Sequence, residues 1–135
     1  MSLPSPMIAT TSVALGGAIG AVLRHQMGRG MTHWLGVKAV TTFPWATLAV
    51  NVSGSLAMGL LAGFLARQGQ GADHWRLFLG VGLLGGFTTF SSFSLEMVML
   101  IERGQALQAV TYALISVLAG LSALYIGLIV MRIAA

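Results

Sequence analysis

A few polar side chains interrupt long apolar stretches of this chain, and their chemistry could serve a function. Thr47, Asn51 and Ser55 recur at intervals of four residues, so a helix places them on one face. The Asn51 amide offers N–H donors and an acceptor, with which it can serve a ligand or simply bond a neighbouring carbonyl. Because polar groups within apolar membrane segments are costly, this face is a candidate site.

The segment Gly80–Glu96 reads GVGLLGGFTTFSSFSLE and is poorly suited to one continuous helix. Glycine is flexible, and the Ser and Thr hydroxyls that follow compete for backbone hydrogen bonds. A break near Gly85 to Thr88 would free several backbone carbonyls, which a membrane protein tolerates only where they are buried or line a cavity. Carbonyl oxygens are hard donors that suit a hard cation such as Na⁺.

Two aromatic residues of the same segment, Phe90 and Phe93, share one helical face. A phenyl ring has a positive edge, so such edges beside the Asn51 amide and hydroxyl donors could partly replace the water shell of a small anion. A proton relay would favour a succession of Asp, Glu or His side chains, and the whole protein has three acidic residues and three histidines. The pattern therefore favours transfer of an anion, although an arbitrary Phe pair is more often core or lipid-facing.

Glu96 is the one acid well inside an apolar stretch. It could end the polar track, cap the second half of the broken helix or pair with Arg24, and the sequence does not decide among these roles. A further apolar stretch carries Tyr112 and Ser116 one helical turn apart.

Composition identifies the elements that must position these residues. Hydrophobic residues make up 56% of the 135 residues and charged residues 7%, which excludes a water-soluble globule and a disordered chain. The chain has no cysteine, and its basic residues are scattered singly, so neither a thiolate site nor nucleic-acid binding is expected. An all-α integral membrane domain over residues 1–135 remains, because a helical span needs about 20 apolar residues. The predicted spans are about 7–27, 43–66, 75–101 and 105–132.

The distribution of positive charge gives little preference for one orientation. With four spans, Arg67, Arg76 and Arg132 lie on one side, and the other side carries Arg24, Arg29, Lys38 and Arg103. Three against four, or three against three if Arg24 lies within the membrane, leaves almost no bias for the positive-inside rule. Insertion in both orientations is therefore a hypothesis, although proteins with weak bias and a fixed orientation also exist.

Glycine pairs spaced by four residues predict close helix–helix contact, because helices in lipid associate through small residues. They can pack the helices of one subunit, or they can serve an oligomer, most simply a dimer, if the protein transports anything. The pairs are Gly16/Gly20, Gly59/Gly63 and Gly82/Gly86.

These segments together resemble the Fluc (CrcB-type) fluoride channel family over nearly the whole chain. The third block is the most specific of the three, and the order and spacing of all three agree with the family. The blocks are Gly16-Gly17-x-x-Gly20-Ala21-x-x-Arg24, Phe43-Pro44-x-x-Thr47-Leu48-x-x-Asn51-x-x-Gly54 and Gly85-Gly86-Phe87-Thr88-Thr89-Phe90-Ser91-Ser92-Phe93-Ser94-x-Glu96.

The resemblance implies an antiparallel, dual-topology homodimer in the bacterial cytoplasmic (inner) membrane. Each subunit would have a broken third helix, and two fluoride pores would cross the dimer. The resemblance also implies a structural Na⁺ at the interface, held by the backbone carbonyls of Gly85 and Thr88. The residues that it assigns to the fluoride pathway are Asn51, Phe90, Phe93, Thr47, Ser91, Tyr112, Ser116, Arg24 and Glu96.

Two other functions remain open at this point. A proton-coupled exporter of cationic drugs would need a membrane carboxylate, and Glu96 is the available one. A non-transporting assembly subunit would use only the glycine pairs and would leave Asn51, Phe90 and Phe93 without a role. Passive conduction of fluoride, without an enzymatic reaction, accounts for most of the features.

Overall fold

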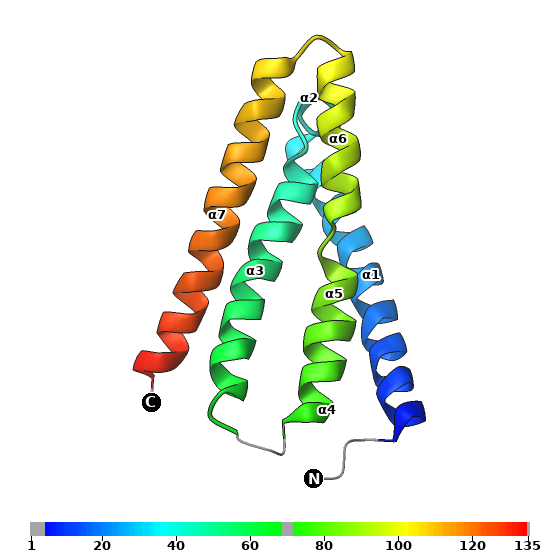
Figure 1. Ribbon diagram of the computed structural model, residues 1–135. Helices are drawn as coiled ribbons and strands as arrows, with labels where there is room; N and C mark the ends of the chain where they lie inside the picture. Colours follow the sequence, from blue (N-terminus) through cyan, green and yellow to red (C-terminus); the bar gives the residue numbers. More distant parts are fainter. Residues whose placement is uncertain (1–4, 69–71, 135) are drawn as a thin grey trace.

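The computed structural model describes residues 5–68 and 72–134, and every element within these ranges is helical. Four helical columns lie side by side, and the first residues of α1 lie at the same end of the bundle as the last residues of α7 (Figure 1). In order the elements are α1 (Pro6–Leu35), α2 (Val37–Thr42), α3 (Trp45–Leu65), α4 (Asp73–Trp75), the π-helix η2 (Arg76–Leu84), α5 (Gly85–Phe87), α6 (Phe90–Glu102) and α7 (Ala106–Ile133).

These four columns are long and apolar enough to cross a membrane, as the composition predicted: Pro6–Leu35, Trp45–Leu65, Asp73–Glu102 and Ala106–Ile133. The 21 residues of α3 rise about 31 Å, close to the thickness of the hydrocarbon core. Elements α4, η2, α5 and α6 together make up the third column.

Helix α1 is longer than the sequence predicted. It begins at Pro6, where the Ser5 hydroxyl accepts a hydrogen bond from the Ile8 N–H, and it continues to Leu35. The predicted span ended at about residue 27, whereas the helix includes the more polar residues that follow. The helix ends at Gly36, whose φ of 85° is in the region that glycine adopts at no steric cost.

The glycine pairs pack helices within this one subunit. Helix α1 packs mainly on η2 and α5, and α3 packs mainly on α7. A Cβ added at Gly82 would lie 3.0 Å from the Gly16 Cα, and one added at Gly127 would lie 2.7 Å from the Leu60 N. Because neither backbone can retreat from such a contact, small residues are required where these helices cross.

Helical backbone is interrupted between α5 and α6. Thr88 has φ −76° and ψ 157°, and Thr89 has φ −151° and ψ 118°, so both residues are extended. The sequence placed the weak point near Gly85 to Thr88, but Gly85–Phe87 remain α-helical. Gly86 is held closely against α1, since an added Cβ would lie 2.9 Å from the Gly17 Cα.

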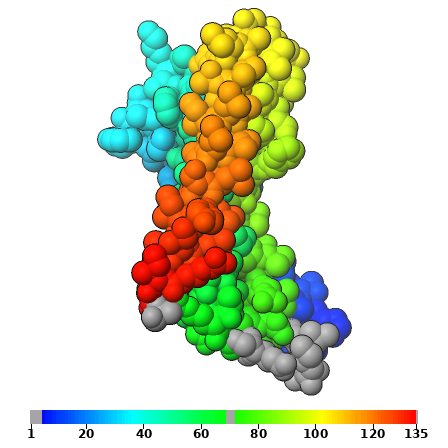
Figure 2. Space-filling model, turned by 60° about the vertical axis from the view of Figure 1, so that its left-hand side comes forward, coloured from blue at the N-terminus to red at the C-terminus, as the bar shows by residue number. Residues whose placement is uncertain are grey.

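A space-filling view shows α7 lying across the front of the molecule (Figure 2). The α2 region projects beside its upper half, next to the turn that joins α6 to α7. That turn contains Gly104 with φ 73° and lies between the predicted spans 75–101 and 105–132.

Candidate functional site

Asn51 on α3 holds the interrupted backbone of the third column. Its Oδ1 accepts a hydrogen bond of 2.8 Å from the Thr89 N–H, and its Nδ2 donates one of 3.0 Å to the Thr89 carbonyl. The amide thus satisfies both main-chain groups of a residue that is only 8% exposed. Because an Asn amide has two N–H donors, one donor of Asn51 remains for another partner.

Thr89 also begins α6, because it occupies the N-cap position. Its Oγ1 accepts a hydrogen bond of 3.1 Å from the Ser92 N–H, which satisfies one of the free N–H groups of the first turn. The same hydroxyl lies 3.2 Å from the Ser91 Oγ and 3.1 Å from the Ser92 Oγ. Three hydroxyls therefore cluster at the start of α6, with the predicted residue Ser91 at the exposed side.

Glu96, one turn after Ser92, lies between two hydroxyl donors from different helices. The Thr47 Oγ1 donates to its Oε1 over 2.6 Å, and the Tyr112 OH donates to its Oε2 over 2.8 Å. Thr47 is 8% exposed and Tyr112 is fully buried, so the carboxylate is tied into a polar layer between α3, α6 and α7. Of the three roles left open by the sequence, this contact fits the end of a polar track.

The other two roles of Glu96 do not occur in this arrangement. Thr89 takes the N-cap position of α6, and the Arg24 Nη1 donates instead to the Thr88 carbonyl over 3.4 Å. Within residues 5–68 and 72–134 the one ion pair joins Arg76 and Asp73.

The aromatic residues continue from the surface into this polar layer. The ring centroids of Phe90 and Phe93 are 5.7 Å apart, and those of Phe93 and Tyr112 are 5.1 Å apart. Phe93 packs against the core residues Leu100, Ala109 and Tyr112, whereas Phe90 is 79% exposed. The two rings therefore share a face, as predicted, but only one of them is enclosed by this chain.

The backbone carbonyls expected to bind Na⁺, those of Gly85 and Thr88, lie beside the helix interruption. In a continuous α-helix the Thr89 N–H would donate to the Gly85 carbonyl, but here it donates to Asn51, so that carbonyl is released. The Thr88 carbonyl, in extended backbone, accepts a hydrogen bond from Arg24 and retains a second lone pair. Both carbonyls are therefore compatible with a hard cation, although two oxygens from one chain would not fill its coordination shell.

Two cavities meet at the interruption. One, of about 300 Å³, is lined by Asn51, Ser55, Thr88, Thr89 and Phe90 among others. The second, of about 390 Å³, is lined by Arg24, Thr47, Thr89, Ser92 and Glu96 among others. Because Thr89 borders both, polar groups follow one another from the Phe90 side of the interruption to Glu96.

Ser116 is the predicted residue that stands apart from these contacts. It lies one turn after Tyr112 on α7, and its Oγ is buried without a hydrogen-bond partner among the described residues. Sequence reasoning missed Thr89 and Ser92 as site residues. The available signal was a Thr followed three residues later by another hydroxyl residue, at a point where a helix restarts.

Four membrane-crossing columns around a buried polar layer define a multi-pass integral membrane protein. The sequence matches the CrcB-like protein family, described as Camphor Resistance (CrcB), over residues 11–128. The chain belongs to this family.

Curated relatives cover nearly the whole chain. A protein of Erythrobacter litoralis is 58% identical over 134 residues, which cover 98% of each chain. One of Novosphingobium aromaticivorans is 57% identical over 126 residues, covering 93% of this chain and 98% of the relative. Both relatives carry the name fluoride-specific ion channel FluC, which is the name of a channel and not of an enzyme.

Proposed function

We propose that this chain conducts fluoride passively across the bacterial inner membrane and thereby lowers fluoride toxicity. The observation that carries the proposal is the continuous set of polar groups from Asn51 through Thr89 and Ser92 to Glu96, located in the middle of apolar columns. The relatives named as fluoride-specific ion channels support the choice of ion.

The groups around the interruption suit a small anion. Asn51 uses one N–H on Thr89 and has the other available, in a cavity that Phe90 also lines. The positive edges of Phe90 and Phe93 would add weak stabilisation without a fixed cation that would trap the ion. The hydroxyls of Thr47, Ser91, Tyr112 and Ser116 would continue the pathway toward Glu96, and Arg24 would attract anions from the surrounding cavity.

Passive conduction is sufficient for export. Hydrogen fluoride is a weak acid that crosses membranes in its neutral form and releases fluoride in the cytoplasm. An ion channel then lets the membrane potential drive the anion outward. Each elementary charge moved across 100 mV is worth about 2.3 kcal/mol, so no ATP is required.

A second copy in the opposite orientation would complete the site. Phe90 is 79% exposed and Gly85 is exposed in the single chain, so the faces expected to touch the ion and Na⁺ lie at its surface. Arg24 donates a hydrogen bond to the Thr88 carbonyl, so its guanidinium lies at the level of the helix interruption and not in a loop. With Arg24 left out of the count, the positive charges on the two sides balance at three against three, which favours dual topology. In such a homodimer the two Gly85 and two Thr88 carbonyls would hold the structural Na⁺, and lipid would cover the remaining apolar surface.

The experiment that tests this function is fluoride release from proteoliposomes that contain this chain alone. We expect rapid, valinomycin-dependent loss of fluoride with little loss of chloride in a matched preparation. No fluoride loss from a folded dimer would refute the proposal. Proton-driven uptake of a lipophilic cation would then be measured, because Glu96 would instead serve an exporter.

A further inference from the structure

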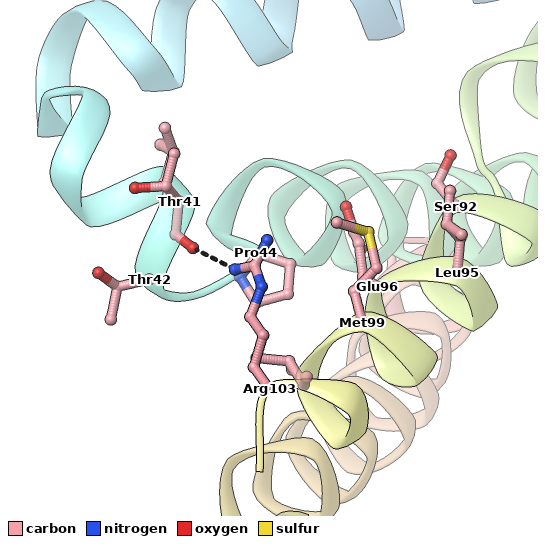
Figure 3. Close-up of a pocket in the computed structure, with 10 residues that line it drawn as sticks. Thr41, Thr42, Pro44, Ser92, Leu95, Glu96, Met99 and Arg103 are labelled. Carbon is pink, nitrogen blue, oxygen red and sulfur yellow. Dashed lines mark hydrogen bonds between the residues drawn. The ribbon is translucent and has the colours of Figure 1, made fainter. Parts of the chain in front are cut away.

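A third cavity borders α6 beside the end of α2, and it has no role in the pathway described so far. Its volume is about 410 Å³, and it is lined by residues of α2, by residues of α6 and by Pro44 and Arg103 in the turns that follow these helices. Figure 3 shows Ser92, Glu96 and Met99 following α6 toward Arg103, whose guanidinium lies opposite the end of α2. Ser92 and Glu96 also line the cavity beside Arg24, so the two cavities share a wall at the polar layer.

The cavity runs along α6 from the helix interruption to the end of the helix. Ser92, Glu96, Met99 and Arg103 recur at intervals of three or four residues, which places them on one helical face. At 1.5 Å per residue the distance from Ser92 to Arg103 along the helix axis is about 16 Å, roughly half of the hydrocarbon thickness. The lining therefore extends from the buried polar layer to the end of α6.

Arg103 is fixed at the outer end of this cavity. Its Nη1 donates to the Thr41 carbonyl over 3.2 Å, and nearby the Gln108 Nε2 donates to the Thr42 carbonyl over 2.8 Å. These two bonds tie the turn after α6 and the start of α7 to the end of α2. The exposed Arg103 side chain is thus held at the rim rather than spread into solvent.

The charges along the cavity are arranged in a definite order. Its lining holds two charged groups, Glu96 at the inner end and Arg103 at the outer end. Both Glu96 oxygens already accept hydrogen bonds, from Thr47 and Tyr112, so the Arg103 charge is not needed to satisfy the carboxylate. Glu102, which precedes Arg103, is exposed and does not line the cavity.

We propose that this cavity is an arm of the ion pathway that joins the helix interruption to the membrane surface, and that Arg103 draws anions into it. The inference rests on the proposed conduction of fluoride and adds an entry route and a positioning residue to it. Arg103 acts through its field at the rim, where it offsets the repulsion that Glu96 exerts on an entering anion.

The expected effect follows from Coulomb's law. A unit charge about 10 Å from an anion in water raises the local anion concentration about twofold at low ionic strength. At about 1 M ionic strength the screening length falls to about 3 Å, and the enrichment disappears. A purely structural role of Arg103 would have no such dependence on ionic strength.

The test is fluoride current in planar bilayers, at constant fluoride, with ionic strength adjusted by an impermeant organic salt. Arg103→Gln retains an N–H donor for the Thr41 carbonyl and loses the charge. We expect about half of the wild-type current near 0.01 M ionic strength and the full wild-type current near 1 M. Arg103→Lys should match the wild type at both ionic strengths, and Arg132→Gln, which removes a charge at the end of α7, is the matched control.

Either of two results would overturn the inference. The first is a wild-type current through Arg103→Gln at both ionic strengths, and the second is a current that falls by the same factor at both. If Arg103→Gln does not fold, Thr41→Lys in the wild-type background adds a charge at the same rim and should raise the current at low ionic strength only; no increase contradicts the role of the rim charge. Absence of fluoride current in the wild type refutes the proposed function itself, and the entry route with it.

Discussion

Replacement of Asn51 by Ala removes both hydrogen bonds that hold the extended backbone at Thr89. The Thr89 N–H and carbonyl, 2.8 and 3.0 Å from the amide, would be left without partners in a residue that is 8% exposed. Each unsatisfied buried main-chain group costs about 1–3 kcal/mol, so the native interruption loses about 2–6 kcal/mol. Even the lower value shifts its equilibrium with competing backbone arrangements by about 30-fold.

Two measurements on purified protein separate the consequences. Fluoride release from proteoliposomes should fall at least tenfold for Asn51→Ala, and the temperature at which the purified protein loses its chromatographic peak should fall as well. Asn51→Asp keeps an acceptor for the Thr89 N–H but loses the donor, so its stability should lie between that of Asn51→Ala and that of the wild type. Ser53→Ala is the control on the same helix, because among the described residues the Ser53 hydroxyl bonds to its own helix, at the Ala49 and Val50 carbonyls.

The reasoning fails if Asn51→Ala keeps both the wild-type flux and the wild-type thermal stability. In that case the interruption is maintained without the amide, and Asn51 has no part in the pathway. A loss of flux with unchanged stability would show that the free N–H of Asn51 contacts the ion, while the two bonds to Thr89 contribute little.

Three further predictions concern the polar layer, the rings and the helix crossings. Tyr112→Phe removes a donor to a carboxylate, so we expect lower flux and about 1.5–3 kcal/mol lower stability, measured by the same two assays; wild-type values would contradict the polar layer. Phe93→Ile should lower flux and cost about 1 kcal/mol of stability, whereas Phe90→Ile should lower flux alone because that ring is 79% exposed; wild-type flux in the double variant would refute the role of the rings. Gly20→Ala should abolish the peak of folded protein in size-exclusion chromatography, because its Cβ would lie 2.8 Å from the main-chain nitrogen of Phe87 in α5. Gly17→Ala, with 3.9 Å to its nearest neighbour, should fold; a folded Gly20→Ala protein would show that the crossing can widen.

The spans could be read from the sequence because the membrane imposes a simple rule. An apolar stretch long enough to cross must satisfy its backbone internally, so 56% hydrophobic residues with few charges leave little choice but helices. The same physics made Asn51 and Glu96 conspicuous, since polar groups are rare at that depth. Small residues at four-residue spacing likewise predicted where helices touch.

Partners within the site could not be read from the sequence. Thr89 appears as one hydroxyl among several, yet its backbone is the partner of Asn51, 38 residues away. Glu96 had three possible roles, and its contacts to Thr47 and Tyr112 fit one of them, the end of a polar track. The end of α1 was also misplaced, because local composition does not reveal that a polar segment continues a helix.

The sequence by itself therefore determined the number of membrane spans, the glycine crossings and the polar residues that need a partner. The tertiary structure decided which partner each residue has and where the helical backbone opens. The physical reason is that span formation depends on the transfer of contiguous residues into hydrocarbon, which is a local property of the chain. The interruption at Thr88 and Thr89 depends instead on an amide that another helix brings within hydrogen-bonding distance.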